Sequence, residues 1–212
     1  FDMDIEKFDI STLHPELYKA KTKTPEIIKV PALRILAING SGDPKGPRFQ
    51  DSVAALYATA YTIKFMPRKG ITPEGYVDFK IPALEALWSM KSGREFDLKK
   101  KDQWLWEVFV VVPGFVTQAI VKQATELVAI KKPNPRYEDL HVSTLEEKRS
   151  VQLLHLGSYE NEQADIELLH KFINQSGLKP SARHHEIYLS DPSRTAKNKL
   201  RTILRQPVVP LA

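Results

Sequence analysis

The stretch ALRILAINGSGDPKGPRFQDSVAALYATAYTIK, residues 32–64, contains a complete strand, turn and helix pattern. Residues 32–39 form a short apolar run that ends in Gly40-Ser41-Gly42-Asp43-Pro44, and these residue types favour turns, so the run is expected to be a strand. From Arg48 to Lys64 apolar residues recur every three or four positions, which predicts an amphipathic helix. The first part of the fold is therefore a strand followed directly by a helix.

A second stretch of the chain has the same order of elements. VQLLHLG, residues 151–157, predicts a strand that ends at a glycine, and the apolar spacing from Asn161 predicts a helix that ends at Gly177. Further strands are expected at 76–88, 104–112, 140–146 and 184–189, and further helices at 117–131 and 196–204. Groups of strands without strict alternation with helices favour an α+β fold over a parallel doubly wound sheet. The two similar stretches indicate an internal duplication, which would place a ligand groove between the halves.

The chain is expected to form one domain behind a polar leading segment. Residues 1–28 are rich in lysine, threonine and acidic residues and contain Thr24-Pro25, so they are expected to precede the folded domain rather than belong to it. The domain would then span residues 29–208, in two halves at about 29–113 and 114–208.

Composition excludes several kinds of chemistry. The 212 residues are 42% hydrophobic and 27% charged, as in an ordinary globular protein, and they include no cysteine. Disulfides, thiolate zinc sites, cysteine nucleophiles and iron–sulfur clusters are therefore excluded. No HExxH pattern, Gly-x-Ser-x-Gly elbow or three-glycine dinucleotide loop is present, and Asp43 after Gly40-x-Gly42 would repel a pyrophosphate. We expect neither a metal nor a cofactor.

The net charge of +5 is not arranged as a nucleic-acid-binding surface. Basic residues cluster at Lys99–Lys101 and between Arg194 and Arg205, but neither cluster has interleaved aromatic residues or a helix-turn-helix pattern. We therefore expect no specific nucleic-acid partner. The longest apolar run, Val108–Val112, is too short to cross a membrane, and the N-terminal residues lack the basic and apolar parts of a signal peptide. The protein is expected to be cytoplasmic, without a membrane partner.

The segment HHEIYLSD, residues 184–191, contains the candidate carboxylate. Side chains alternate between the two faces of a strand, so Glu186 and Tyr188 share one face while His185 and Ile187 share the other. Because the second face is the better core face, we expect it to pack on the helices and Glu186 to point to the opposite side of the sheet. The alternative is an exposed edge strand with an ion-paired glutamate.

Three tryptophans are candidates for the walls of a ligand groove. Trp104 and Trp106 alternate with other side chains along a strand that is apolar on both faces, so the strand is expected to be covered on both sides. If a ligand groove is one of the covers, these two rings and Trp88 offer flat surfaces suited to aromatic or cationic molecules. The alternative is that the three rings are ordinary core residues.

Several stretches together resemble the GyrI-like small-molecule-binding family. They are NGSGDP (39–44), PGFVT (113–117), VQLLHLGSYENE (151–162) and, most specifically, HHEIYLSDPSRT (184–195) with KLRTILRQPV (199–208). The resemblance covers about residues 29–208. It implies a duplicated βαββ fold whose antiparallel sheets form a concave, aromatic-lined ligand cleft. It also implies that Glu186 is the glutamate that lies in this cleft.

The resemblance implies three kinds of function. Similar domains are effector-binding parts of multidrug-sensing regulators, gyrase-inhibitory proteins, or stand-alone hydrolases that open the cyclopropane ring of DNA-alkylating cyclopropanoid compounds. A regulator needs a DNA-binding domain, which the polar leading segment does not supply, and an acidic DNA mimic does not match a basic chain. What remains is a stand-alone protein, as a monomer or homodimer, for a hydrophobic or cationic aromatic small molecule. It either hydrolyses a cyclopropanoid toxin or sequesters its ligand without chemistry.

Glu186 is the principal candidate for chemistry because the family motif and the strand alternation agree on it. It would act as a general base on a water molecule or stabilise the charge that develops as the ring opens. Tyr188 is the second catalytic candidate. Burial between indole rings would raise the pKa of the Glu186 carboxyl toward neutrality. The side chains expected to line the groove are Trp106, Trp88, Trp104, Tyr57, His155 and His184.

Overall fold

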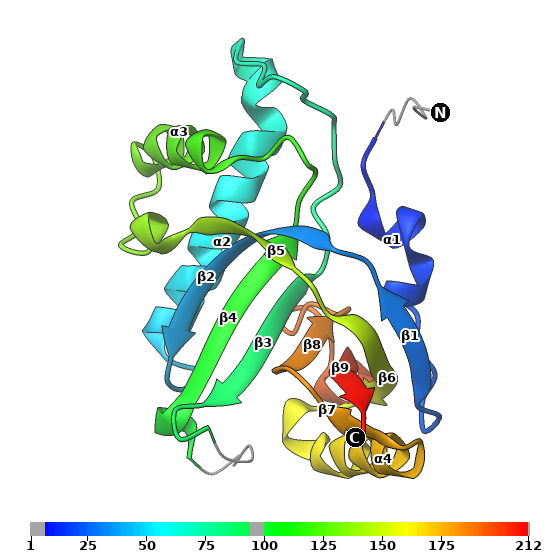
Figure 1. The fold of residues 1–212 in the computed structure, drawn as a ribbon. Coiled ribbons are helices and arrows are strands. Elements are labelled where there is room, and N and C mark those ends of the chain that lie inside the picture. The colour runs from blue at the N-terminus through cyan, green and yellow to red at the C-terminus, as the bar shows by residue number, and fades with distance from the viewer. Residues whose placement is uncertain (1–6, 94–99, 212) are drawn as a thin grey trace, which may run out of the picture. The chain divides into compact units, whose positions relative to one another are not determined.

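The chain folds into two compact units whose segments alternate along the sequence. The structure, a computed structural model, describes residues 7–93 and 100–211 (Figure 1), so Lys99 of the first basic cluster lies outside the described residues. Unit 1 comprises the chain up to Leu13 with Leu33–Pro82 and Met90–Leu145, and unit 2 comprises His14–Ala32, Ala83–Ser89 and the chain from Glu146 onward. This division differs from the expected consecutive halves, because residues 83–89 contribute a strand to the sheet of unit 2.

The sheet of unit 1 has three antiparallel strands with two helices packed against them. β2 (Leu33–Ser41) pairs with both β4 (Trp104–Val111) and β5 (His141–Leu145). α2 (Pro47–Phe65) contacts β2, α3 (Gln118–Ala129) contacts β5, and the two helices contact each other (Figure 1). The hydroxyl of Thr117 accepts a hydrogen bond from the backbone N–H of Ile120, which caps α3 as the sequence predicted.

The apolar character of β4 follows from burial on both of its faces. Every residue from Trp106 to Val111 is buried, as expected for a strand without a polar face. Leu36 and Ile38 of β2 and Leu56 of α2 are also completely buried. These side chains form the core of unit 1.

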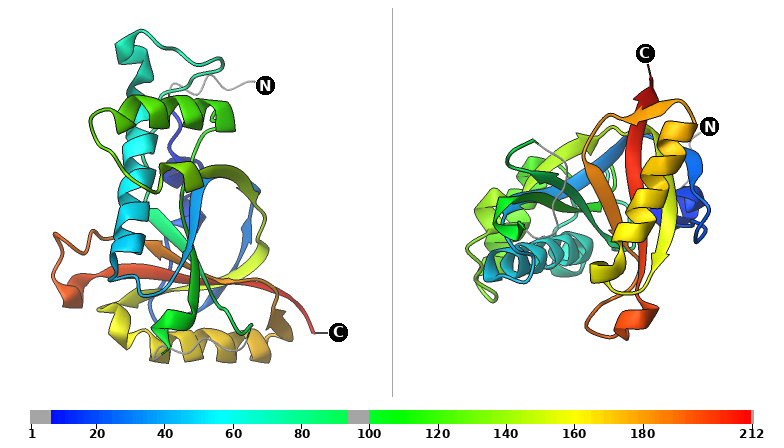
Figure 2. Two further views of the ribbon diagram at one scale, coloured as in Figure 1. Left: turned by 90° about the vertical axis from the view of Figure 1, so that its left-hand side faces the viewer. Right: turned by 90° about the horizontal axis from the view of Figure 1, so that it is seen from below.

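The sheet of unit 2 has five antiparallel strands in the order β1, β6, β9, β8, β3. Their bounds are β1 (Glu26–Val30), β6 (Lys148–Leu156), β9 (Arg201–Pro210), β8 (His184–Tyr188) and β3 (Leu84–Met90). A short strand, β7 (Leu178–Pro180), pairs with the C-terminal part of β9. Figure 2 shows α4 (Gln163–Gln175) running alongside β9 in the view from below.

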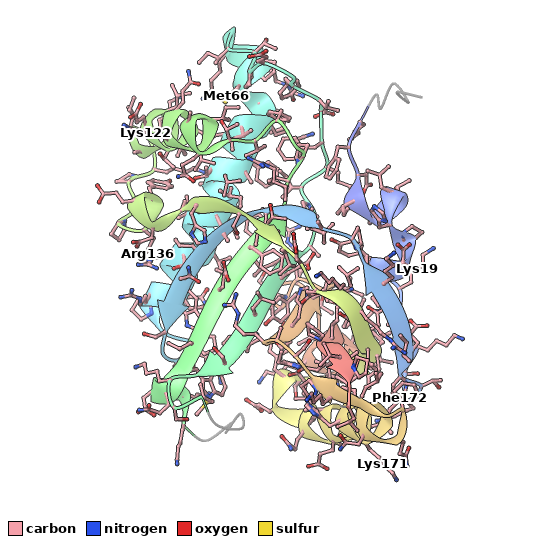
Figure 3. The ribbon with its side chains drawn as sticks, viewed as in Figure 1. Lys19, Met66, Lys122, Arg136, Lys171 and Phe172 are labelled. Carbon is pink, nitrogen blue, oxygen red and sulfur yellow. The ribbon has the colours of Figure 1, made fainter. Side chains whose placement is uncertain are left out.

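One face of α4 forms a core with the strands of unit 2. Leu169 and Ile173 are fully buried and belong to one cluster with Val151, Leu153 and Leu204 of the neighbouring strands. Phe172 packs against this cluster, whereas the adjacent Lys171 is exposed (Figure 3). Gly177 follows the helix in the left-handed conformation, with φ of 67°, as expected for a glycine at a helix end.

The α+β class is confirmed, and the order strand, helix, strand, strand occurs twice along the chain. It is found first as β2, α2, β3, β4 and again as β6, α4, β8, β9, with β7 inserted in the second copy. The remaining short helical segments are α1 (Ile10–Leu13) and 3₁₀ turns at Pro15–Leu17, Met66–Lys69, Lys101–Gln103, Tyr137–Asp139, Tyr159–Asn161 and Lys197–Lys199. Within residues 7–93 and 100–211, no helix is long and apolar enough to cross a membrane.

Two predicted elements are wrong. The helix expected at 196–204 is instead a 3₁₀ turn at Lys197–Lys199 followed by the first residues of β9, because Leu200, Ile203 and Leu204 have helical spacing only by coincidence. Polar residues of β9, including Arg205, are buried, so the polar positions do not mark an exposed face. The strand expected at 76–88 begins only at Leu84.

The N-terminal segment is part of the fold, contrary to the expectation for residues 1–28. Within residues 14–23, which we call the N-terminal strap, Leu17 is buried and its carbonyl accepts a hydrogen bond from Arg205. The Gln152 side chain donates to the carbonyls of Glu16 and Lys19. Residues 26–30 then form β1. Polar composition was misleading because the strap is held by its backbone carbonyls, which every sequence has.

Candidate functional site

Strand β8 presents two chemically different faces. His184, Glu186 and Tyr188 are partly buried on one face, whereas His185 and Ile187 are fully buried on the other. The strand is hydrogen-bonded to β3 on one side and to β9 on the other, so it is an interior strand and not the exposed edge strand of the alternative interpretation. The predicted alternation is therefore present.

The covers of the two faces are the reverse of the expected ones. Leu204, the partner of Glu186 in the β8–β9 register, packs in the cluster with α4, so Glu186 lies on the face covered by this helix. The His185 and Ile187 face is covered by the N-terminal strap, since Ile187 clusters with Leu154 and Tyr18. The expectation was wrong because the strap was not recognised as part of the fold.

A chain of hydrogen bonds converges on the Glu186 carboxylate. The Tyr188 hydroxyl donates to Glu186 Oε2 at 2.6 Å, and the Trp88 indole N–H donates to the same hydroxyl oxygen at 3.0 Å. Trp88 reaches this position because it stands opposite His184 in the β3–β8 register. Strand pairing thus brings together residues that are far apart in the sequence.

A second carboxyl group, that of Glu162, is hydrogen-bonded to Glu186. Glu162 directly precedes α4 and is only 4% exposed. Burial raises its pKa to about 10, with further contributions from the charge and hydrogen bond of Glu186. Glu162 therefore holds a proton at neutral pH.

Glu186 is ionised, which corrects the expected direction of its pKa. Burial by itself raises the pKa of this carboxyl, but the His184 ring 3.3 Å away and the hydrogen bonds from Tyr188 and Glu162 outweigh burial and lower the pKa. The pair consequently shares one proton, which resides on Glu162 and is donated to Glu186. A buried acid next to a buried base is an arrangement suited to proton transfer.

Two polar atoms beside this pair lack hydrogen bonds. Glu162 Oε1 and His184 Nε2 are buried, and within residues 7–93 and 100–211 neither finds a hydrogen-bond partner. His184 Nε2 lies 3.3 Å from Glu186 Oε1 without the alignment of a hydrogen bond. Buried polar atoms are nearly always satisfied, so each of these two atoms is a candidate contact for a ligand or water molecule.

Tyr159 forms the outer part of this group of residues. Its ring packs edge-on against Tyr188 with centroids 5.8 Å apart, and 36% of the residue is exposed. Burial of its hydroxyl and the nearby charges of Glu162 and Glu186 raise the pKa of Tyr159 to about 12. We call Glu162, Glu186, Tyr188, His184, Trp88 and Tyr159 the glutamate cluster; all six belong to unit 2.

Of the residues predicted from the sequence, four meet in the glutamate cluster: Glu186, Tyr188, His184 and Trp88. His155 also belongs to unit 2, but its ring nitrogens are used elsewhere. Nδ1 lies 2.8 Å from Asp165 Oδ2, and Nε2 lies 3.0 Å from the Ser158 carbonyl. His155 is also 3% exposed, so it ties β6 to α4 instead of facing solvent.

The remaining predicted residues, Trp104, Trp106 and Tyr57, belong to unit 1. Trp106 is 2% exposed, and its indole N–H donates to the Gly42 carbonyl at 3.2 Å. Its ring packs against Phe49 and covers Gly40, where any side chain would overlap it. Trp106 is therefore packed within unit 1, which agrees with the alternative that this tryptophan is a core residue.

Sequence reasoning missed Glu162 and Tyr159. Both occur in SYENE, residues 158–162, which lies at the end of one of the stretches that resemble the family. Acidic residues at the start of a helix are common because they interact favourably with its dipole, so Glu162 did not stand out. The useful clue was its place after the strand and glycine of the repeated pattern. Within the described part of the chain, no group of three or more His, Asp or Glu side chains is placed to hold a metal ion.

Comparison with known proteins gives a family and close structural relatives. A family model described as a GyrI-like small molecule binding domain matches residues 23–209. A hydrolase from Listeria innocua is 37% identical with a TM-score of 0.88, over 96% of this chain and 100% of that chain. An uncharacterized conserved protein from the same organism is 37% identical with a TM-score of 0.88, over 95% of this chain and 100% of that chain. A further Listeria innocua hydrolase is 34% identical with a TM-score of 0.85, over 95% of this chain and 100% of that chain. No curated protein matches the chain.

Proposed function

Because the chain belongs to the GyrI-like small-molecule-binding domain family, we propose that it binds a small electrophilic molecule at the glutamate cluster and hydrolyses it. The observation that carries this proposal is the buried carboxyl pair, in which the pKa of Glu162 is raised and that of Glu186 is lowered. An acid and a base in contact can donate and accept protons in one reaction. Two solved relatives of similar length are described as hydrolases, which supports the proposal.

The proposed substrate class is a cyclopropanoid alkylating compound, in which a strained three-membered ring is conjugated to an unsaturated ketone. Glu186 takes a proton from water, and the water oxygen forms a bond to a ring carbon. The ring C–C bond breaks, and its electron pair moves into the conjugated system, whose oxygen takes the proton of Glu162. Glu186 then returns its proton to Glu162, so the net reaction is addition of one water molecule.

The other members of the cluster support this role. The hydrogen bond from Tyr188 holds Oε2 of Glu186, and the proposed water contacts Oε1, which lies 3.3 Å from His184 Nε2. The side chains of Glu186 and His184 keep exposures of 13% and 14%, and Tyr159 is exposed beside them. A ligand would approach there, with the Tyr159 ring as a flat surface for an aromatic or cationic group.

The test is incubation of the purified protein with a cyclopropanoid alkylator while its ultraviolet spectrum is followed. We expect many substrate molecules to be converted per protein molecule. Glu186→Gln and Glu162→Gln should each reduce the rate by about 10²- to 10⁴-fold, the usual contribution of a general acid or base. Glu160→Gln is the matched control, because Glu160 is exposed and lies two residues from Glu162.

Two outcomes would contradict parts of the proposal. If Glu186→Gln keeps full activity, the role given to Glu186 is wrong. If the protein retains one equivalent of the compound unchanged and forms no product, the cluster sequesters its ligand without hydrolysis. In the second case the ionised Glu186 acts only as a counter-charge.

A further inference from the structure

The face of β8 opposite the glutamate cluster carries a buried network of charged residues. The ring of His185 is completely buried, with Nε2 2.8 Å from Glu85 Oε2 and Nδ1 2.9 Å from Glu147 Oε1. Glu85 stands on β3, and Glu147 directly precedes β6. On the far side, Arg205 Nη1 of β9 lies 3.8 Å from Glu147 Oε2. The proposed reaction uses none of these residues.

The geometry fits an imidazolium at His185. A neutral imidazole has one N–H and cannot donate from both ring nitrogens, yet both lie at hydrogen-bonding distance from a carboxylate oxygen. Two buried carboxylates are then balanced by two buried cations, His185 and Arg205. Burial by itself lowers the pKa of His185, but the charges and hydrogen bonds of Glu147 and Glu85 raise it overall.

The other groups around the network agree with this charge state. The Tyr18 hydroxyl donates to the second oxygen of Glu85 at 2.7 Å. Burial raises the pKa of Glu147, but His185, Arg205 and Arg183 outweigh it and lower the pKa. Arg205 is held by Gln152 and by the Leu17 carbonyl of the strap. Both ring nitrogens of His185 therefore have carboxylate partners, whereas Glu147 Oε2 has only the ion-pair contact with Arg205 at 3.8 Å.

This network determines which face of the sheet receives Glu186. β8 has five residues, and His185 stands opposite Leu87 of β3 and Arg205 of β9. A shift of the strand by one residue turns every side chain to the other face. Such a shift in either direction would move Glu186 to the face of Glu85 and Glu147, where it would add an unpaired buried negative charge.

We propose that His185 is a positioning residue: bound between Glu85 and Glu147, it fixes the register of β8 so that Glu186 and Tyr188 point into the glutamate cluster. The effect on turnover rests on the proposed function, but the effect on the carboxyl pair does not. Loss of the contacts of His185 with Glu85 and Glu147 allows β8 to move relative to β3. This movement separates Glu186 from Glu162 and Tyr188 from Trp88.

The first experiment uses the unaltered protein. With ¹⁵N-labelled histidine, NMR should show both ring nitrogens of His185 still protonated at pH values above the ordinary titration range of histidine. A neutral His185 ring at pH 8 would overturn the proposal. This measurement needs no ligand and no variant.

The second experiment measures the carboxyl pair by ¹³C NMR of the glutamate side chains in His185→Gln and Glu147→Gln. We expect the titration of Glu162, which lies far above the ordinary range in the unaltered protein, to move by at least about one pH unit toward it. Glu146→Gln is the matched control, because Glu146 is exposed and adjacent to Glu147, and it should leave the titration unchanged. If His185→Gln does not fold, the titration of Glu162 in Glu147→Gln decides whether the proposal holds. If the titration of Glu162 is unchanged in the folded variants, His185 stabilises the sheet without positioning Glu186, and the proposal fails.

Turnover gives an independent comparison. If the unaltered protein hydrolyses the cyclopropanoid, Glu147→Gln should lower kcat by about 100-fold while KM changes far less, because a displaced general base affects the chemical step. A 100-fold rise in KM with an unchanged kcat would argue against a positioning role for His185. If there is no hydrolysis at all, the proposed function fails while the two NMR experiments still decide the role of His185.

Discussion

Replacement of Glu162 by glutamine should make the stability of the protein less dependent on pH. The folded-state pKa of Glu162 is raised to about 10 from an ordinary value of 4.5. A raised pKa gives a stability contribution that is present in full below the ordinary value and is lost as pH rises toward the folded value. Glu186 has a lowered pKa, so its contribution changes only at acidic pH. Between pH 6 and 8, Glu162 is therefore the member of the pair that makes unfolding more favourable as pH rises.

The magnitude follows from one proton. A group that keeps one extra proton in the folded state changes the free energy of unfolding by about 1.4 kcal/mol per pH unit, so pH 6 to 8 corresponds to at most about 2.7 kcal/mol. His185 also has a raised pKa and lowers stability with rising pH, so the relevant quantity is the difference between the unaltered protein and Glu162→Gln. The glutamine amide keeps a donor toward Glu186 but has no proton to lose.

Urea unfolding followed by circular dichroism at pH 6, 7 and 8 measures this difference. We expect the curve of Glu162→Gln to fall less steeply with pH than that of the unaltered protein, while the exposed control Glu160→Gln follows the unaltered protein. Parallel pH dependences for Glu162→Gln and the unaltered protein would show that Glu162 is not the proton-holding member of the pair. The reasoning about the acid in the proposed reaction would then be refuted.

Three further predictions concern packing and buried charge. Gly40→Ala should lower the free energy of unfolding by about 1–3 kcal/mol in urea titration, because the new Cβ overlaps the indole ring of Trp106. Leu169→Ala should lower the thermal stability by about 2–5 kcal/mol, since it removes a fully buried side chain of α4, whereas Lys171→Ala should have little effect. Arg205→Met should cost about 3–5 kcal/mol in chemical unfolding, because it leaves Glu147 without one of its two buried cations. A loss under 1 kcal/mol for Arg205→Met would show that the network tolerates the missing charge.

Local patterns predicted the elements whose signals are local. The glycine-rich turn after β2, the helical spacing of α2 and the Thr117 cap of α3 each depend on neighbouring residues, and each is present. The first residues of β9 were predicted to be part of a helix because the pairing that buries Arg205 involves distant segments. The prediction for the N-terminal strap was wrong for the same reason, because the contacts of the strap use backbone carbonyls that composition does not reveal.

The candidate site likewise has features that the local sequence predicts and features that only tertiary contacts create. The sequence alone determined that His184, Glu186 and Tyr188 share one face of a strand and that His185 lies on the other, because the two-residue period of a strand is a property of the local backbone. Only the tertiary structure decided that α4 covers Glu186, that Glu162 meets it, and that Trp88 reaches Tyr188 through the pairing of β3 with β8. The charge states of the two glutamates follow from burial and from neighbouring charges, which distant parts of the chain supply, so no local pattern contains them.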